Sequence, residues 1–135
     1  MRVVDTSAWL EYMSGSTTGQ LIAAELPPRH EWLVPTIVQL EMAKFLLRTA
    51  GESLAEDVAA FSQKCIVVPL DTDIALAAAE IGLRHKLATA DAIVYATAQL
   101  FEADLLTCDA HFKDLDGVRY VPKSAAAAKP DEASS

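Results

Sequence analysis

The feature that most constrains the fold stands at the start of the sequence, where a short apolar run ends in an acid. Val3-Val4 is followed directly by Asp5, and Thr6-Ser7 then open a helical segment. This pattern predicts a buried strand whose carboxyl end delivers a carboxylate to a strand-to-helix turn. In open α/β sheets, ligands bind outside the carboxyl ends of the strands. Asp5 is therefore a candidate functional residue.

The rest of the sequence alternates short apolar runs with helical patterns. Such alternation predicts an α/β domain, with a central parallel sheet of about five short strands flanked by helices. The order of the strands does not follow from the sequence. The expected strands cover residues 3–4, 32–34, 65–68, 105–107 and 118–121, and the expected helices cover 6–12, 17–26, 36–49, 52–63, 71–85 and 90–101.

Polar residues mark where several of these helices begin. Thr17 or Thr18 is the expected N-cap of the second helix, and Thr89 that of the sixth. The stretch Asp71-Thr72-Asp73 is expected to cap the fifth. One domain is expected over residues 1–123. Residues 124–135 are small and polar, and we expect them to form a disordered tail.

The composition excludes several classes of protein. With 52% hydrophobic residues, the chain can bury a core, but it contains no apolar run long enough to span a membrane and no signal peptide, so a cytoplasmic protein is expected. The net charge of −8 argues against a non-specific nucleic-acid coat and suits a basic protein partner. Cys65 and Cys108 are far apart and lack metal-ligand spacing, which predicts buried free thiols.

Glu41 is a carboxylate in a largely apolar helical stripe. Its neighbours in projection along the predicted helix are Ile37, Val38 and Phe45, with Arg48 beside them. Burying an unpaired carboxylate costs several kcal/mol, so a functional role is one explanation. An ordinary pair with Lys44 or Arg48 within the helix is the other.

Two later acids also stand at informative places. Asp91 falls in the first turn of its predicted helix, on the core-facing side, where the helix dipole alone would favour a negative charge. Asp109 follows the apolar strand Leu105-Leu106-Thr107, where a plain turn-forming role is the alternative. For Asp5 the corresponding alternative is a helix N-cap.

If the four acids meet, their mutual repulsion would raise pKa values or require a cation. Hard oxygen ligands suit magnesium or manganese and not zinc. The sequence contains no arrangement typical of a nucleophilic serine or cysteine and no glycine-rich phosphate loop. His85 and His111 carry no special signal, and we expect them to be surface or structural histidines.

The order of these motifs resembles the PIN-domain nucleases. The resemblance rests on Asp5-Thr6-Ser7-Ala8-Trp9, on Glu41 in a mid-chain helix, on Ala90-Asp91-Ala92-Ile93, and on the stretch 107–112 that reads Thr-Cys-Asp-Ala-His-Phe. It extends from about Met1 to Pro122. In size the chain is most similar to the VapC toxins of bacterial toxin–antitoxin pairs.

The resemblance implies a magnesium-dependent endoribonuclease, with manganese as an alternative ion. Asp5 and Asp109 match direct metal ligands of the family, and Asp91 and Glu41 would complete the shell directly or through water. Ser7 and Thr107 match polar positions that support such sites. Ala110-His111 stand where some relatives carry a further acid, and Asp114 and Asp116 are the nearest substitutes, so the choice between one and two ions stays open. Four basic residues are candidate RNA contacts, with ordinary solvated charges as the alternative: Lys44, Arg48, Arg84 and Lys86.

The resemblance also implies partners. These are an RNA substrate, a VapB-type antitoxin whose tail covers the acidic cleft, a second copy of the chain in a homodimer, and DNA only through the antitoxin. A housekeeping PIN nuclease without a toxic role would share every residue named. A phosphoacceptor signalling domain is an alternative from a different class, although Asp5 lacks the paired acid that such domains carry at the first strand.

Overall fold

A computed structural model describes residues 1–123, which form a five-stranded parallel sheet with helices on both sides. The fold class predicted from the sequence is confirmed. The disordered tail predicted for residues 124–135 lies outside the described residues. The strands are β1 (Arg2–Val4), β2 (Trp32–Pro35), β3 (Ile66–Val68), β4 (Asp104–Thr107) and β5 (Val118–Tyr120).

The strand order is β3-β2-β1-β4-β5, so the first strand is also the central one. β1 pairs with β4 in a register that sets Val4 opposite Leu106, and it pairs with β2 on its other edge. Because all strands are parallel, the residues that follow β1 and β4 leave the same edge of the sheet next to each other. This arrangement brings the segments after Val4 and after Thr107 together.

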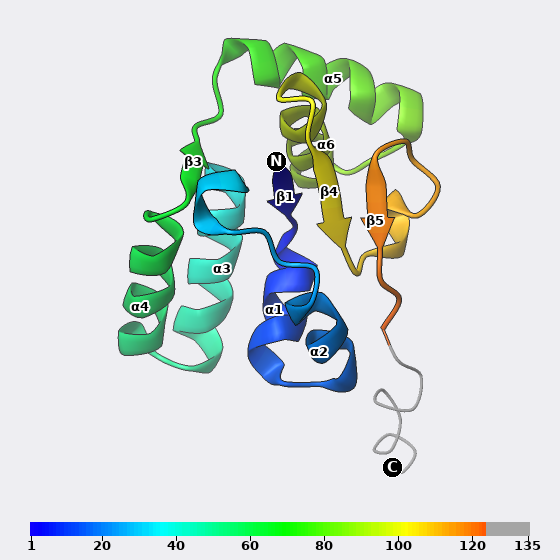
Figure 1. The fold of residues 1–135 in the computed structure, drawn as a ribbon. Helices are drawn as coiled ribbons and strands as arrows, with labels where there is room; N and C mark the ends of the chain where they lie inside the picture. Colours follow the sequence, from blue (N-terminus) through cyan, green and yellow to red (C-terminus); the bar gives the residue numbers. More distant parts are fainter. Residues whose placement is uncertain (124–135) are drawn as a thin grey trace.

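Residues 1–123 contain six α-helices and two short 3₁₀ helices, η1 (Arg29–Glu31) and η2 (Ala110–Phe112). The α-helices pack as three successive pairs, with α5 across the top of the view in Figure 1 and the other two pairs below. They are α1 (Thr6–Ser14), α2 (Thr17–Ala23), α3 (Thr36–Thr49), α4 (Glu52–Ser62), α5 (Thr72–His85) and α6 (Thr89–Leu100).

Two of the three predicted N-caps are wrong by one residue. Ser16, not Thr17 or Thr18, caps α2, because its Oγ accepts the Gly19 N–H at 2.9 Å. Ala88 takes the cap position of α6, and Thr89 is the first helical residue. Within the predicted capping stretch Asp71-Thr72-Asp73, Asp71 is the residue that caps α5, because its Oδ1 accepts the Ile74 N–H at 2.9 Å.

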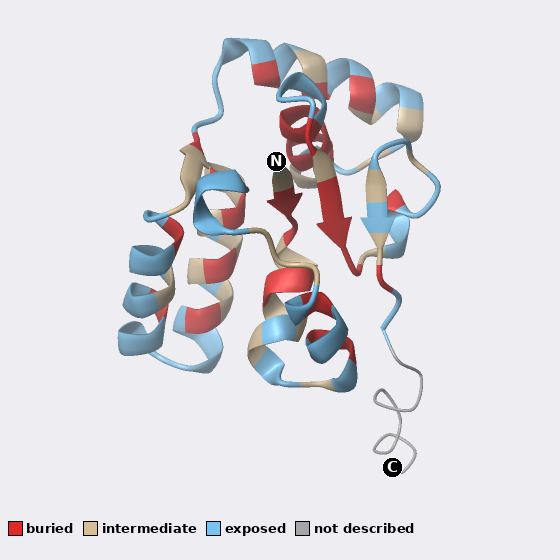
Figure 2. Cartoon of the chain, viewed as in Figure 1, coloured by how far each residue is buried: buried red, intermediate tan, exposed pale blue. Residues whose placement is uncertain are grey.

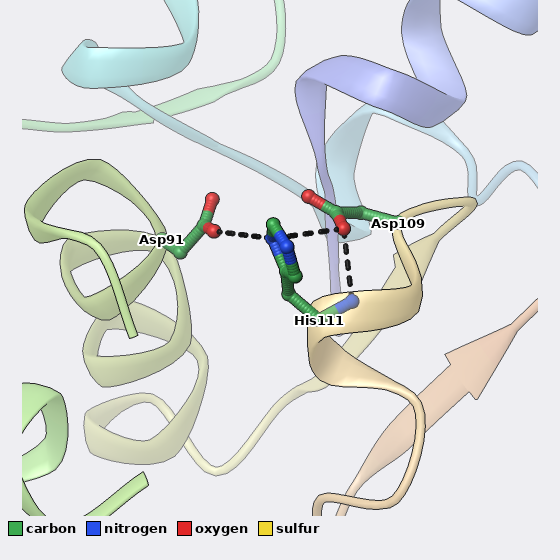
Figure 3. Close-up of side chains that lie close together, drawn as sticks. All are labelled: Asp91, Asp109 and His111. Atoms are coloured by element: carbon green, nitrogen blue, oxygen red, sulfur yellow. Dashed lines mark hydrogen bonds and ion pairs between the residues drawn. The ribbon is translucent and has the colours of Figure 1, made fainter. Parts of the chain in front are cut away.

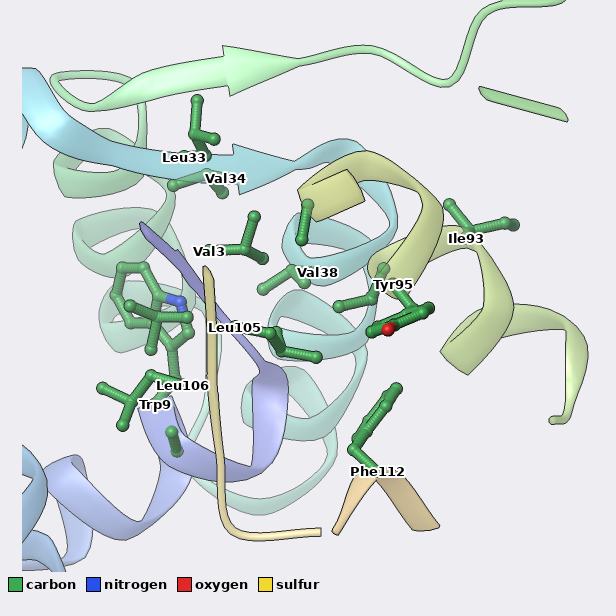
Figure 4. Close-up of a cluster of buried hydrophobic side chains, with 14 of the residues drawn as sticks. Val3, Trp9, Leu33, Val34, Val38, Ile93, Tyr95, Leu105, Leu106 and Phe112 are labelled. Atoms are coloured by element: carbon green, nitrogen blue, oxygen red, sulfur yellow. The ribbon is translucent and has the colours of Figure 1, made fainter. Parts of the chain in front are cut away.

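The core is centred on the three middle strands, β2, β1 and β4, and on α6 (Figure 2). Val3, Val4, Leu105 and Leu106 are completely buried, as expected for parallel strands covered on both faces. α6 is buried without interruption from Ala92 to Ala98. Figure 4 shows side chains from β1, β4, α3, α6 and η2 meeting in one cluster. α6 is therefore buried on all sides over residues 92–98, and its first turn is only partly covered.

Neither cysteine forms a disulfide: Cys108 is buried and Cys65 half-buried, and both are free thiols. Within residues 1–123, no helix is both long enough and apolar enough to cross a membrane.

Candidate active site

Asp5 lies where β1 ends beside β4. Its backbone N–H donates to the Leu106 carbonyl oxygen at 2.9 Å, which extends the ladder by one residue beyond the strand. The residue is buried, with 4% of its surface exposed. Asp5 takes the N-cap position of α1, but its side chain makes no cap bond, so capping does not explain the carboxylate.

Two hydroxyl groups hold the Asp5 carboxylate. Ser7 Oγ donates to Asp5 Oδ2 at 2.8 Å, and Thr107 Oγ1 donates to the same oxygen at 2.9 Å. Each hydroxyl oxygen also accepts a backbone N–H, from Cys108 at 3.0 Å and from Asp109 at 2.9 Å. Both hydroxyls bond Oδ2 and not Oδ1, so Oδ1 is the oxygen with which Asp5 could bind a metal ion.

Glu41 reaches the same region from α3. Its Oε1 accepts the Thr6 hydroxyl at 2.7 Å, which ties α3 to the start of α1. Among the described residues, Glu41 forms no ion pair with Lys44 or Arg48, so the pairing alternative is not what the structure shows. The acid in the apolar stripe instead lies next to the carboxyl edge of the sheet.

Asp91 and Asp109 approach each other from α6 and η2, with His111 between them (Figure 3). Asp91 is in the first turn of α6. Asp109 caps η2, because its Oδ1 accepts the His111 N–H at 2.9 Å. It therefore also has the turn-forming role that the sequence offered as the alternative. His111 Nδ1 lies 3.2 Å from Asp109 Oδ1 and 3.4 Å from Asp91 Oδ2.

Burial and neighbouring charge raise the pKa of two of these acids, Asp5 and Asp91. The pKa of Asp5 is raised to about 6, mainly by burial and to a smaller extent by the negative charges of Asp91 and Asp109, while the hydroxyls of Ser7 and Thr107 oppose the rise. The pKa of Asp91 is also raised, first by burial and then by Asp109, while His111 lowers it and Glu41 adds a smaller increase. A cation in this position would relieve the repulsion.

All four predicted acids line one open cleft of about 710 Å³. Its other walls are largely apolar and include Leu10, Phe45 and Leu54. The structure thus brings together acids from four separate parts of the chain. It leaves out Asp114 and Asp116, which line a different pocket beside α5 and α6.

None of the four candidate RNA contacts lines this cleft. Arg48 contacts a cleft residue, because its guanidinium lies 5.3 Å from the ring centroid of Phe45. Arg84 pairs with Glu80 at 3.9 Å on α5, and Lys86 ends that helix with a positive φ of 57°. Lys44 is exposed on α3.

The sequence did not identify three residues in or beside the cleft. Thr6 donates a hydrogen bond to Glu41, and His111 lies against Asp91 and Asp109. Lys123 lines the cleft, with its Nζ 3.9 Å from Glu11 Oε2. His111 is exposed, as expected, but its ring is turned toward the site. No local pattern in the sequence marks His111, because its contact with Asp91 joins η2 to another element, α6.

The donor set fits a divalent cation. Asp91, Asp109 and His111 each offer one ligand atom, and these atoms lie within 4.8 Å of one another. The Asp5 carboxylate interacts electrostatically with both acids. Carboxylate oxygens suit magnesium and manganese, and imidazole is acceptable to manganese.

Comparison with known families gives one clear assignment. Residues 2–118 match the model of the PIN domain. No curated protein matches the chain.

Several solved structures with the same fold are described as toxins or toxin–antitoxin complexes. A toxin–antitoxin complex from Klebsiella pneumoniae superposes with a TM-score of 0.79 at 21% identity, covering 92% of this chain and 100% of that one. VapC20 of Mycobacterium tuberculosis, described as a toxin that cleaves the sarcin–ricin loop, gives 0.72 at 23% identity, covering 90% and 100%. VapBC-1 from nontypeable Haemophilus influenzae gives 0.68 at 15%, covering 90% and 98%. At these identities the likeness shows the fold.

Proposed function

Because the chain belongs to the PIN-domain family, whose members are nucleases, we propose that it is a metal-dependent endoribonuclease and the toxin of a toxin–antitoxin pair. The observation that carries the proposal is the meeting of Asp5, Glu41, Asp91 and Asp109 in one cleft. Membership of this family argues against the alternative that the chain is a phosphoacceptor signalling domain. The cytoplasm, where ribosomal and transfer RNA are found, is the proposed site of action.

In this proposal Asp5, Asp91 and Asp109 hold a magnesium or manganese ion, and Glu41 completes the shell directly or through water. When bound, such an ion lowers the pKa of a coordinated water and stabilises negative charge on the scissile phosphate. Ser7 and Thr107 favour the ionised form of Asp5, because both donate hydrogen bonds to it. Thr6 fixes the orientation of Glu41.

RNA is the proposed substrate class, and a basic side chain of a VapB-type antitoxin is the proposed inhibitor of the cleft. The acidic net charge of −8 supports the basic partner. A homodimer, and contact with DNA through the antitoxin alone, complete the proposed assembly. Lys44, Arg48, Arg84 and Lys86 stay predicted RNA contacts, and Lys123 joins them because it lines the cleft.

Inducible expression in a bacterial host tests this function. New RNA ends would be mapped across the transcriptome while growth is followed, for the wild type, for Asp5→Asn, and for Asp57→Asn as a matched change at an exposed acid of α4. We expect discrete new ends and growth arrest with the wild type and Asp57→Asn, and neither with Asp5→Asn.

Co-expression of the neighbouring gene then separates a toxin from a housekeeping nuclease. Neutralisation of both arrest and cleavage by that gene is expected for a toxin. Cleavage without arrest, unaffected by any neighbour, would identify a housekeeping enzyme. The absence of new ends with the wild type, or equal ends with Asp5→Asn, would refute the nuclease itself.

A further inference from the structure

His111 occupies an unusual position for an exposed histidine. Its side chain is 74% exposed and could extend into solvent, yet Nδ1 lies 3.2 Å from Asp109 Oδ1 and 3.4 Å from Asp91 Oδ2 (Figure 3). The two carboxylates come from different elements, η2 and α6. The ring nitrogen is thus in direct contact with both acids.

The backbone around His111 is well anchored. The next residue, Phe112, is completely buried, and the His111 N–H donates to Asp109 Oδ1 at 2.9 Å. Tyr95 of α6 fixes the segment that follows, because its hydroxyl donates to the Asp116 carbonyl oxygen at 2.7 Å. The position from which the His111 ring projects is therefore set by the fold.

The spacing of the three donor atoms suits one ion. Two ligands at right angles about an octahedral ion lie about 3 Å apart when each is about 2.1 Å from the ion. The Nδ1–oxygen distances of 3.2 and 3.4 Å are close to that value. One ligand atom from each of the three residues lies within 4.8 Å of the other two, and opposite ligands of such an ion lie about 4.2 Å apart. A small movement of the side chains brings all three onto one ion.

A histidine ligand would affect which metal ion the site prefers. Magnesium prefers oxygen ligands and keeps much of its water, whereas imidazole binds transition-metal ions well. Three or four carboxylates alone would leave the choice between magnesium and manganese open. A nitrogen ligand shifts that choice toward the transition metal.

We propose that His111 Nδ1 is a direct ligand of the metal ion bound by Asp91 and Asp109, and that it makes the site selective for manganese over magnesium. The proposal rests on the proposed function, since it assigns the metal of that same centre. The competing role for His111 is a positively charged partner of the two acids, which leaves when the metal binds.

Pulsed electron paramagnetic resonance of Mn²⁺ bound to the full chain distinguishes these roles. The spectrum would be recorded with natural-abundance and with ¹⁵N-histidine-labelled protein, so that any coupled nitrogen is assigned to histidine. The chain has three histidines. His30, exposed and paired with Glu31, supplies the control variant His30→Ala.

We expect a histidine nitrogen coupling in the wild type and in His30→Ala, and its loss in His111→Ala. Loss of an outer-shell partner weakens metal binding by about 10- to 100-fold, so loss of a direct ligand should cost at least as much. Calorimetric titration should therefore show that His111→Ala weakens Mn²⁺ binding by at least about 10-fold, with Mg²⁺ binding changed much less. Bound Mn²⁺ without a histidine coupling, or a coupling that survives in His111→Ala, would overturn this proposal and leave the metal centre intact. A wild type that binds Mg²⁺ but not Mn²⁺ would overturn this proposal alone, and a wild type that binds neither ion would overturn both this proposal and the proposed function.

Discussion

Asp5 meets two demands that conflict in a folded protein. It is buried, yet its proposed role requires the ionised form. The hydroxyls of Ser7 and Thr107 offset part of the desolvation, but burial dominates and the pKa is raised to about 6 from an ordinary value of 3.8. A metal-free site with a charged Asp5 is therefore a source of instability.

This conflict gives a prediction for Asp5→Asn in the absence of metal. The pKa of Asp5 is higher in the folded state than in the unfolded state, so its contribution to stability is fully present below pH 3.8. That contribution is lost as the pH rises from 3.8 through about 6 and the buried carboxyl ionises. The loss amounts to about 3 kcal/mol at pH 7.5. The neutral amide avoids it, so Asp5→Asn should raise the free energy of unfolding by up to about 3 kcal/mol at pH 7.5 and by about 1 kcal/mol at pH 4.5.

Urea unfolding in the presence of a chelator measures both values. Asp57→Asn serves as the control, because Asp57 is exposed and its replacement should change the stability by less than about 0.5 kcal/mol at either pH. A wild type that is as stable as Asp5→Asn at pH 7.5 would show that Asp5 is not strained by its burial.

At the same scale, the sequence identified residues whose local pattern is unusual. Asp5 and Asp109 follow apolar strands, and Glu41 interrupts an apolar stripe, so each is visible without a structure. His111 was missed because its significance depends on Asp91, which is twenty residues earlier and on another element. No local pattern reports such a contact.

At the scale of secondary-structure elements, the backbones of α1 and α2 lie too close together at Gly19 to leave room for a side chain. A Cβ at Gly19 would lie 2.1 Å from the backbone oxygen of Glu11. In contrast, a Cβ at Gly82 in α5 would lie 3.5 Å from Ala92 Cβ and from the Leu87 carbonyl oxygen, which is ordinary contact. Gly82 is therefore a suitable control for Gly19, because both lie in helices and only Gly19 lacks room for a Cβ.

Gly19→Ala should destabilise the protein by about 1–3 kcal/mol, because the backbone of α1 would have to move. Gly82→Ala should leave stability unchanged or raise it by about 0.5–1 kcal/mol, since alanine favours a helix interior. Thermal unfolding of the two variants checks both signs. A Gly19→Ala protein as stable as the wild type would mean that α1 and α2 separate easily.

The elements themselves were largely predictable. Helix α3 begins and ends at the expected residues, and α5 begins after its expected cap, because proline, aspartate and glycine act locally. Ser16 was missed as a cap because Thr17 and Thr18 compete for the same role in sequence. Strand order was not predictable, since pairing of β1 with β4 joins residues about one hundred positions apart.

At the scale of the whole molecule, metal binding should couple to stability. An ion that binds only the folded chain stabilises it by about 2.7 kcal/mol at a concentration one hundred times its dissociation constant. We therefore expect Mn²⁺ to raise the melting temperature of the wild type by several degrees. Asp91→Asn should lose this response.

Asp114→Asn provides the comparison, because Asp114 is an acid outside the cleft. It should respond to Mn²⁺ as the wild type does. An unchanged wild-type melting temperature, or an equal rise in Asp91→Asn, would place metal binding elsewhere or exclude it.

We propose that the four-acid cleft cleaves RNA with the help of a divalent cation. Purified protein would be incubated with a panel of structured RNAs in manganese, magnesium or chelator, with Asp5→Asn shown to be folded by circular dichroism. We expect discrete cuts by the wild type with either metal, more with manganese, and none in chelator or with Asp5→Asn. Cuts that persist in chelator, or that the folded Asp5→Asn protein makes equally well, would show that the four acids and their metal ion are not the nuclease site.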